Sequence, residues 1–588
     1  MKEKIQQLRD DIEAAMGMSP ADLEIRNARI LDVYTETLYE GNIFIRNGKI
    51  IGINPDSAVT AREVFDAKGR IAVPGFMDTH VHIESTLVSS ETLSEVIVPW
   101  GTTTMFVDAM EIGNVAGVPG LRALVQNSRD LPYRILLEIP SRVPTAPGLE
   151  TTGAVIDAAD VDELIREDIA VSLGELDPSK VFGRQDEYLS KIVSTKEQRK
   201  IINGHTIDLD WERLNVYATA GITDDHESCT YEQLLDRIRL GLKPLVREGS
   251  SERNLENLIR GVVENSIPTD NMMFCTDDKA MSDILREGHI SYNVQKSIDL
   301  GLDPIKALKM ASFNAARHFR IEDRVGSICP GRFADIVLLD DLKVIRPAFV
   351  FQNGKLVAED GTLLQKIPTG DYPDFIRRSV KLYPDFSAEK FRIPAEGTNA
   401  TVKIINAIRD QVITTASVET LPIENGEVMP DVDNDILRIS VVERYGKNGN
   451  VGNGFIRGFS LKKGAIAESI SHDHHNIVVV GTNREDMETA VRELEKHQGG
   501  MTAVADGEVL ATFPLPIAGL LTPDPLDVVL PQYDRVNEMV ASLGCTYAAP
   551  FMTLMFISLP TIPECGLTDM GFIDVATRSF QDVVLETK

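Results

Sequence analysis

The chain has 588 residues, a formal net charge of −29, 43% hydrophobic residues and 25% charged residues. This length predicts two or three domains, and this composition is typical of a globular protein. The negative charge argues against a nucleic-acid or anionic-membrane partner, because the phosphates of either would repel it.

The sequence shows no export or membrane signal. The first residues, MKEKIQQLRDDIEAAMGM, mix both signs of charge and lack the apolar core of a signal peptide. No apolar run approaches the ~20 residues of a membrane span. The five cysteines are scattered and odd in number, which fits reduced thiols rather than a disulfide framework. We therefore predict a cytoplasmic protein with no membrane partner.

Residues 1–69 are predicted to form a leading helix and the first part of a small antiparallel β unit. The helical pattern of residues 1–20 ends at Gly17 and at Ser19-Pro20. Short β runs then follow, and Arg46-Asn47-Gly48 is a hairpin-turn signal between two of them.

Residues 70–325 alternate strand and helix patterns. Eight such repeats over about 230 residues predict an α/β fold with a (β/α)8 TIM-like barrel. An open doubly wound sheet is the alternative, but no Gly-rich dinucleotide loop follows the first strand. The strand candidates are 71–80, 103–108, 134–138, 169–175, 199–205, 221–226, 243–247 and 272–277.

Three further segments follow the predicted barrel. Residues 326–365 resume β runs and would complete the N-terminal β unit, which makes that unit discontinuous. Residues 366–400 are rich in Pro, Asp and Gly, which predicts a linker. Residues 401–588 alternate β runs with a helical pattern at 484–496, which predicts an α+β C-terminal domain.

Histidines and carboxylates recur at the ends of the predicted strands. His80 and His82 share one face of the first strand, because successive side chains of a strand alternate. Each such residue alone has an ordinary reading, a histidine that caps a strand or a glutamate on a solvated loop. Active sites of these barrels gather at the C-terminal strand ends, so the shared placement predicts a metal site. Its residues are His80, His82, Glu175, His205, His226 and Asp277.

These six residues could bind two divalent metal ions, with Glu175 as the candidate bridge. The lack of cysteine ligands and the extra carboxylate favour Mn²⁺ or Fe²⁺ over Zn²⁺. Two metals that share a water lower its pKa and present hydroxide at neutral pH. Asp277 is predicted to accept the proton of that water and to deliver it to a leaving group. Glu175 and Asp277 are therefore the predicted catalytic residues.

The sequence resembles the amidohydrolase superfamily, and specifically its bacterial and archaeal adenine deaminases. The resemblance implies a composite β-sandwich, a metal-bearing barrel with the six ligands above, and a C-terminal domain of adenine-deaminase type. It also implies hydrolysis of adenine to hypoxanthine and ammonia, in which a metal-bound hydroxide attacks C6 and Asp277 shuttles the proton. The segments that carry it are PGFMDTHVHIEST at 74–86 and residues 173–175, 204–205, 220–228, 247–250, 275–278, 317–319, 330–337, 471–479 and 514–520.

Three loops at the predicted rim depart from that family's usual pattern. Leu176-Asp177-Pro178-Ser179 stands where relatives usually carry Met-Asn-like residues, and Thr206-Ile207 where they have a Pro-Gly pair. Lys279-Ala280-Met281 stands where they often have Arg and Pro. Because rim loops contact the substrate, an amidohydrolase that acts on another aminopurine or a cyclic amide stays open as an alternative. A second alternative is a non-catalytic metal-binding barrel.

Glu84, Glu248 and His474 are further candidates for substrate binding. The two glutamates stand near the predicted rim and could hydrogen-bond a purine edge; a helix-start or surface glutamate is the alternative. His474 belongs to the cluster Ser471–Asn476, which could close over the barrel mouth, bind another metal or shape a turn. The predicted partners are a small-molecule purine and further copies of the chain in a homo-oligomer.

Overall fold

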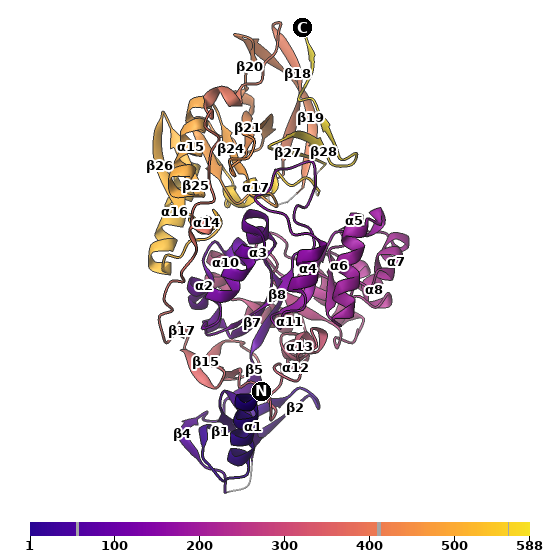
Figure 1. Ribbon diagram of the computed structural model, residues 1–588, viewed down its shortest axis with the longest axis vertical. Coiled ribbons are helices and arrows are strands. Elements are labelled where there is room, and N and C mark those ends of the chain that lie inside the picture. Colours follow the sequence, from indigo (N-terminus) through magenta and orange to yellow (C-terminus); the bar gives the residue numbers. More distant parts are fainter. Residues whose placement is uncertain (55–57, 208, 409–412, 562–563) are drawn as a thin grey trace.

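The computed structural model of the chain is elongated, with three regions of sheet stacked along its long axis (Figure 1). A nine-stranded sheet lies near the N-terminus, parallel strands with surrounding helices lie in the middle, and a ten-stranded sheet lies near the C-terminus. The structure describes residues 1–54, 58–207, 209–408, 413–561 and 564–588. No helix among these residues is long and apolar enough to cross a membrane.

The nine-stranded sheet combines two segments that are far apart in the sequence. After helix α1 (Lys2–Ala15), β1 (Ala21–Asp32) pairs antiparallel with β2 (Thr37–Arg46). Strand β5 (Ile71–Pro74) pairs with β1 on one side and with β14 (Ile336–Leu339) on the other. The sheet therefore joins strands from before and after the parallel region. Its remaining strands are β3 (Lys49–Ile53), β4 (Ala61–Asp66), β15 (Pro347–Gln352), β16 (Lys355–Glu359) and β17 (Thr362–Leu363).

The prediction of a single strand over 71–80 is wrong, because this segment forms two strands. Strand β5 belongs to the nine-stranded sheet, whereas β6 (Phe76–Val81) opens the parallel region. Gly75 lies between them, and a Cβ atom there would stand 2.1 Å from Thr103 Oγ1. Only glycine therefore permits this close approach. The apolar run gave no sign of the break, because both strands are buried throughout.

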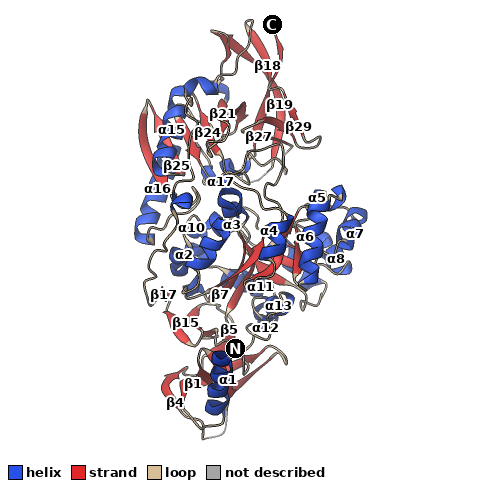
Figure 2. Cartoon of the chain, viewed as in Figure 1, coloured by secondary structure: helices blue, strands red, loops and turns tan. Residues whose placement is uncertain are grey.

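Eight parallel strands form the middle of the molecule, with helices packed around them (Figure 2). They make a five-stranded sheet, β10-β9-β8-β7-β6, and a three-stranded sheet, β11-β12-β13. A parallel bridge joins Val81 to Asp277, and Thr223 N donates a hydrogen bond of 3.0 Å to Ile202 O. The two sheets are thus in contact at both edges. The strands after β6 are β7 (Thr102–Asp108), β8 (Arg134–Ile139), β9 (Ala170–Leu176), β10 (Ile201–Gly204), β11 (Asp224–Asp225), β12 (Lys243–Arg247) and β13 (Met273–Cys275).

The helices of this region form because of local caps and an apolar face. Thr230 and Gln233 make a capping box at the start of α8 (Tyr231–Arg239). Helix α9 (Leu255–Glu264) buries Leu258 and Val262 against the strands. The others are α2 (Ser90–Ile97), α3 (Met110–Asn127), α4 (Ala158–Leu164), α5 (Pro178–Gly183), α6 (Asp186–Glu197), α7 (Trp211–Thr219), α10 (Met281–Glu287), α11 (Ile290–Asp299), α12 (Pro304–Met310) and α13 (Phe313–His318).

The ten-stranded sheet is largely antiparallel and is covered by α15 (Arg484–His497) and α16 (Leu526–Ser542). Its strands are β18 (Asn399–Ala407), β19 (Thr414–Glu424), β20 (Glu427–Val428), β21 (Ile436–Val442), β22 (Val451–Arg457), β23 (Ala465–Glu468), β24 (Ile477–Gly481), β25 (Gly500–Ala505), β26 (Glu508–Pro514) and β30 (Val584–Thr587). A short sheet of β27 (Cys565–Thr568), β28 (Gly571–Asp574) and β29 (Ser579–Gln581) follows α17 (Pro550–Phe556).

The segment predicted as a linker packs closely on this sheet. Val380, Phe386 and Phe391 are buried in one apolar cluster with Ile477 and Leu494. A short helix, α14 (Asp374–Arg377), also lies in this segment. The Pro and Asp residues between these apolar side chains suggested an open connection, but burial of the apolar side chains fixes the chain to the sheet.

Candidate metal centre

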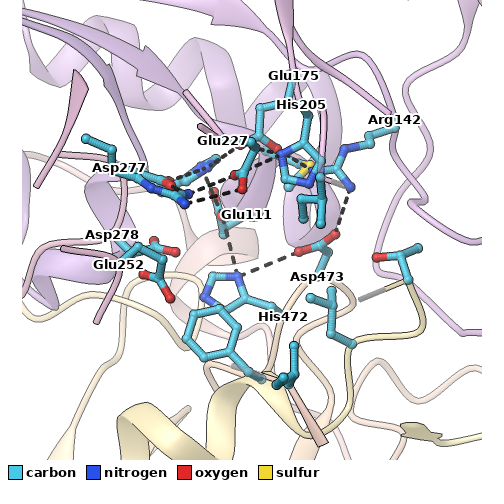
Figure 3. Close-up of a pocket in the computed structure, with 18 of the residues that line it drawn as sticks. Glu111, Arg142, Glu175, His205, Glu227, Glu252, Asp277, Asp278, His472 and Asp473 are labelled. Carbon is cyan, nitrogen blue, oxygen red and sulfur yellow. Dashed lines mark hydrogen bonds and ion pairs between the residues drawn. The ribbon is translucent and has the colours of Figure 1, made fainter. Parts of the chain in front are cut away.

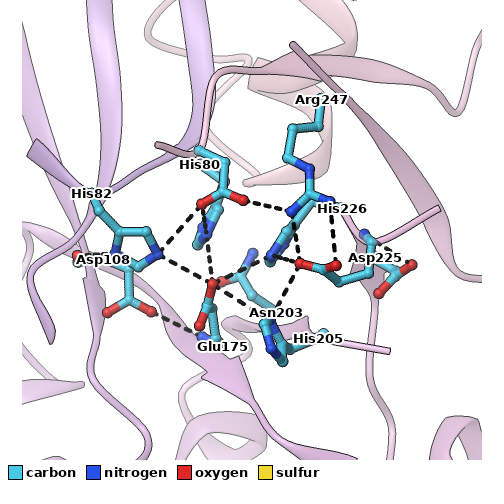
Figure 4. Close-up of polar contacts among 12 residues, drawn as sticks. His80, His82, Asp108, Glu175, Asn203, His205, Asp225, His226 and Arg247 are labelled. Carbon is cyan, nitrogen blue, oxygen red and sulfur yellow. Dashed lines mark hydrogen bonds and ion pairs between the residues drawn. The ribbon is translucent and has the colours of Figure 1, made fainter. Parts of the chain in front are cut away.

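The six predicted ligand side chains lie together at the C-terminal ends of the parallel strands. Figure 4 shows the four histidines and Glu175. Parallel strands bring their carboxyl ends to one edge, so residues almost 200 positions apart meet there. His80 lies in β6 and Glu175 in β9. Three of the others directly follow a strand: His82 follows β6, His205 follows β10 and His226 follows β11. Asp277 is the second residue after β13.

One carboxylate oxygen is the focus of this group. Glu175 Oε1 lies 3.1 Å from His80 Nε2, 3.2 Å from His82 Nε2, 3.3 Å from His226 Nε2 and 3.6 Å from His205 Nδ1. Asp277 Oδ1 approaches the same space, at 3.6 Å from His82 Nε2. Four imidazoles and two carboxylates therefore converge on one small volume.

This donor set fits divalent metal ions. His205 Nδ1 and His226 Nε2 are buried and form no hydrogen bond with a described residue. Ligand atoms of His80, Glu175, His226 and Asp277 all lie within 4.8 Å of one another. Imidazole and carboxylate ligands without thiolate suit Mn²⁺, Fe²⁺ or Zn²⁺. The unsatisfied ring nitrogens are the atoms that such ions would bind.

Hydrogen bonds to Nδ1 orient the rings of His80 and His82. His80 Nδ1 donates a hydrogen bond of 2.6 Å to Glu138, and His82 Nδ1 donates one of 3.1 Å to the backbone oxygen of Asp108. Each bond places a proton on Nδ1 and leaves Nε2 for the metal. Burial raises the pKa of Glu138 to about 8, although His80 opposes this shift.

A buried arginine keeps Asp277 charged. Arg247 Nη1 donates to Asp277 Oδ2 at 2.7 Å and to Glu227 Oε1 at 2.8 Å. Burial alone would raise the pKa of Asp277, but Arg247 lowers it below the ordinary aspartate value. Asp277 is therefore a carboxylate at neutral pH, the form in which it can bind a metal or accept a proton.

A second buried arginine does the same for Glu175. Arg142 Nη2 donates to Glu175 Oε2, the oxygen that faces away from the histidines. Burial would raise the pKa of Glu175, but His205 and Arg142 lower it well below the ordinary value. The other carboxylate oxygen, Oε1, therefore faces the four imidazoles.

A cavity of about 260 Å³ opens onto this group (Figure 3). His82, Glu175, His205 and Asp277 line it from the strand ends. The opposite wall comes from the C-terminal part of the chain and consists of Ile413, His472, Asp473, Phe556, Leu559 and Thr561. The loop between β23 and β24 thus lies over the strand ends, which is the first of the three roles considered for the cluster Ser471–Asn476.

The cavity also contains polar side chains that were not among the predicted ligands or catalytic residues. Glu227 and Asp278 directly follow His226 and Asp277, so their position beside predicted ligands could have indicated them. Glu111 and Arg142 follow β7 and β8 by only a few residues, so the strand-end rule applied to every strand would have reached them. The others are Arg247, Glu252, His472 and Asp473.

The three further candidates for substrate binding do not line this cavity. Glu84 accepts a hydrogen bond of 3.1 Å from the backbone of Ile112, and Glu248 pairs with Lys296 Nζ at 2.6 Å. His474 Nδ1 accepts a hydrogen bond of 3.0 Å from the backbone of Asn476. All three are almost fully buried, and their contact with a substrate stays a prediction.

Comparison with known proteins agrees with this site. The amidohydrolase family matches residues 71–362, and the adenine deaminase C-terminal domain matches residues 411–579. The chain is 56% identical over 581 residues to a protein named adenine deaminase from Desulforamulus reducens, with 99% of each chain covered. It is 38% identical to one from Dehalococcoides mccartyi, with 98% of this chain and 99% of the relative covered. An adenine deaminase 2 from Carboxydothermus hydrogenoformans is 39% identical, with 98% and 100% covered. The chain therefore belongs to the adenine deaminase family.

Proposed function

We propose that this protein hydrolyses adenine to hypoxanthine and ammonia. One observation carries the proposal: four imidazoles and two carboxylates converge at one cavity, in a chain 56% identical over nearly its full length to a protein named adenine deaminase. These side chains come from distant parts of the sequence and lie together in space, so the proposal rests on geometry as well as on similarity.

The metal ligands in this proposal are His80, His82, Glu175, His205, His226 and Asp277. They would bind two divalent ions, Mn²⁺ or Fe²⁺ rather than Zn²⁺, with Glu175 as the bridge. The approach of all four imidazoles to Glu175 Oε1 within 3.6 Å supports this role. When bound, such ions lower the pKa of water and supply hydroxide at neutral pH.

Asp277 moves the proton in this mechanism. Its Oδ2 accepts a hydrogen bond from Arg247, and its Oδ1 faces the imidazoles. As a carboxylate it can accept a proton from the attacking water and deliver it to the amino group of adenine. The oxygen of water then bonds to C6, the bond between C6 and the amino nitrogen breaks, and ammonia leaves.

Glu227 adds a carboxylate to the donor set beside His205 and His226, and the ligand atoms of these three residues lie within 4.8 Å of one another. Glu227 Oε1 lies 3.1 Å from His226 Nε2 and 3.5 Å from His205 Nδ1. Burial would raise the pKa of Glu227, but Arg247 and His205 lower it well below the ordinary value. Its negative charge adds to the attraction of the site for cations.

We also propose that the two parallel sheets close into one (β/α)8 barrel. The bridge from Val81 to Asp277 and the bond from Thr223 to Ile202 support closure at both edges. In this division residues 70–325 form the barrel, 1–69 and 326–365 a β-sandwich, and 401–588 the C-terminal domain. The homo-oligomeric state and the cytoplasmic location stay predictions.

Ammonia release tests the proposed reaction. Purified protein loaded with Mn²⁺ or Fe²⁺ is expected to release ammonia from adenine, and the same protein treated with a chelator is expected not to. A panel of other aminopurines and cyclic amides serves as the comparison. Turnover of one of these without turnover of adenine would refute the adenine claim and leave the metal centre in place.

A further inference from the structure

One imidazole of the C-terminal part reaches the cavity without being a predicted metal ligand. His472 lies in the loop between β23 and β24 and lines the same cavity as Glu175 and Asp277 (Figure 3). It is only 4% exposed. The C-terminal sheet therefore presents a polar ring directly to the space beside the metal centre.

The His472 ring is fixed by its surroundings. Its Nδ1 lies 3.6 Å from Glu111 Oε1 and 3.7 Å from Asp473 Oδ1. The ring stacks on Phe556, with centroids 5.0 Å apart and planes at 14°. Its backbone N–H donates a hydrogen bond of 2.9 Å to Met555 O. Two carboxylates, an aromatic face and a backbone bond thus set the orientation of this side chain.

The other ring nitrogen is left without a partner. His472 Nε2 is buried and forms no hydrogen bond with a described residue. In Figure 3 the carboxylates of Glu111 and Asp473 both face Nδ1, which favours the ring proton there. Nε2 is then an acceptor. A buried polar atom left unpaired costs free energy, so a ligand that donates a hydrogen bond to it gains affinity.

We infer that His472 is a specificity-determining residue, whose Nε2 accepts a hydrogen bond from an N–H group of adenine bound beside the metal centre. The inference rests on the proposed adenine deamination and names a recognition contact for it. Adenine carries N–H groups on its amino nitrogen and on one ring nitrogen. Methylation of a ring nitrogen removes the ring N–H of adenine, so a methylated base leaves Nε2 unpaired and the site rejects it.

The loop that carries His472 is anchored to the strand ends. Thr145 Oγ1 donates a hydrogen bond of 2.7 Å to Asp473 Oδ2, and Arg142 Nη1 lies 3.5 Å from the same oxygen. Arg142 also donates to Glu175. Arg142 therefore contacts both Asp473, the neighbour of the recognition residue, and the proposed bridging carboxylate Glu175.

The test compares His472→Phe with the wild type, using adenine and adenines methylated at N3, N7 or N9. Phenylalanine keeps the stacking on Phe556 and removes both nitrogens. The variant is expected to keep its metal content and to raise the KM for adenine about tenfold or more, as for the loss of one buried hydrogen bond. It is also expected to reduce the discrimination against the methylated isomer that the wild type rejects most.

His497→Gln is the matched control, because His497 lies on α15, pairs with Glu493 at 2.9 Å and does not line the cavity. It is expected to leave KM and discrimination unchanged. A second variant, Phe556→Leu, removes the stacking partner and no polar group, and should raise KM by less than His472→Phe does. Unchanged KM and unchanged discrimination in His472→Phe would overturn the inference, as would an equal loss of kcat for every base.

Equilibrium binding of adenine separates this inference from the proposed reaction. If the wild type binds adenine but does not deaminate it, the proposed function fails, and weaker binding by His472→Phe still supports the contact. If both proteins bind adenine equally, the contact is refuted, whatever the reaction is.

Discussion

The two walls of the cavity contain the same kind of side chain in opposite electrostatic surroundings. On the barrel wall, burial would lower the pKa of His82, but Glu111 and Glu175 raise it well above the ordinary histidine value. Behind the C-terminal wall, burial lowers the pKa of His474, which does not line the cavity, to about 3. One wall is thus strongly attractive to cations, whereas the loop behind the other has neutral imidazoles. This difference agrees with the proposed division, in which the barrel wall binds the metal ions and the C-terminal wall contacts a neutral base through His472.

Removing the carboxylate of Glu175 should have the largest effect on metal binding by the barrel wall. Glu175→Gln takes away the charge that faces all four imidazoles. The variant is expected to purify with little bound Mn²⁺ or Fe²⁺ and to show no measurable deamination. Metal analysis of the purified protein, alongside the ammonia assay, checks this. If the variant keeps two metal ions per chain, Glu175 is not the bridging ligand.

The proposed proton carrier should come next. Asp277→Asn is expected to lower kcat roughly 10²–10⁴-fold, the usual contribution of a positioned acid–base group. Asp270→Asn is the control, since Asp270 pairs with Lys309 at 3.1 Å and does not line the cavity. Steady-state kinetics on adenine provide the measurement. A loss below tenfold would mean that another group transfers the proton.

A smaller loss of metal affinity is expected when the hydrogen-bond partner of a ligand is changed. Glu138→Gln weakens the hydrogen bond that orients His80 and should cost about 10–100-fold in metal affinity or activity. Competition with a metal-binding dye measures the affinity. If affinity and activity both stay at the wild-type level, the orientation of His80 does not depend on Glu138.

The smallest effect concerns stability on the C-terminal side. Glu468, at the end of β23, is buried, and neither of its carboxylate oxygens forms a hydrogen bond with a described residue. Burial raises its pKa well above 4.5. The folded state therefore binds the proton more tightly than the unfolded state, and its stability falls as pH rises above the ordinary carboxyl range. Glu468→Gln cannot ionise and removes this term.

Thermal unfolding at several pH values tests this expectation. Between pH 5 and 8 the Tm of the wild type should fall relative to that of Glu468→Gln, and the gap should widen steadily with pH. A constant gap would show that Glu468 has an ordinary pKa in the folded protein. Glu495→Gln is the comparison, because Glu495 is partly exposed to solvent. The Tm gap between this variant and the wild type should not widen with pH in the same way.

The barrel wall could be predicted from the sequence because one geometric rule covers it. Parallel strands place their carboxyl ends at a common edge, so strand-end histidines and carboxylates had to meet. The C-terminal wall has no such rule. His472 and His82 lie in one cavity only because the ten-stranded sheet docks on the strand ends, and no spacing in the chain encodes that docking. For the same reason no pattern in the sequence shows that His472, and not His474 two residues along, lines the cavity.

Two further features depended on packing rather than on pattern. The break at Gly75 follows from contact with Thr103, a residue of the next strand. The predicted linker is fixed by Phe386 and Phe391, whose partners come from β24 and α15. In both cases the deciding neighbour lies in another element, so local composition could not show it.

The most direct test of two walls with separate roles measures metal content and adenine binding in Glu175→Gln and His472→Phe side by side. We expect Glu175→Gln to lose its metal ions. We expect His472→Phe to keep them and to bind adenine about tenfold more weakly than the wild type. Loss of metal from His472→Phe to the extent seen in Glu175→Gln would contradict the account, because the two walls would then act as one site.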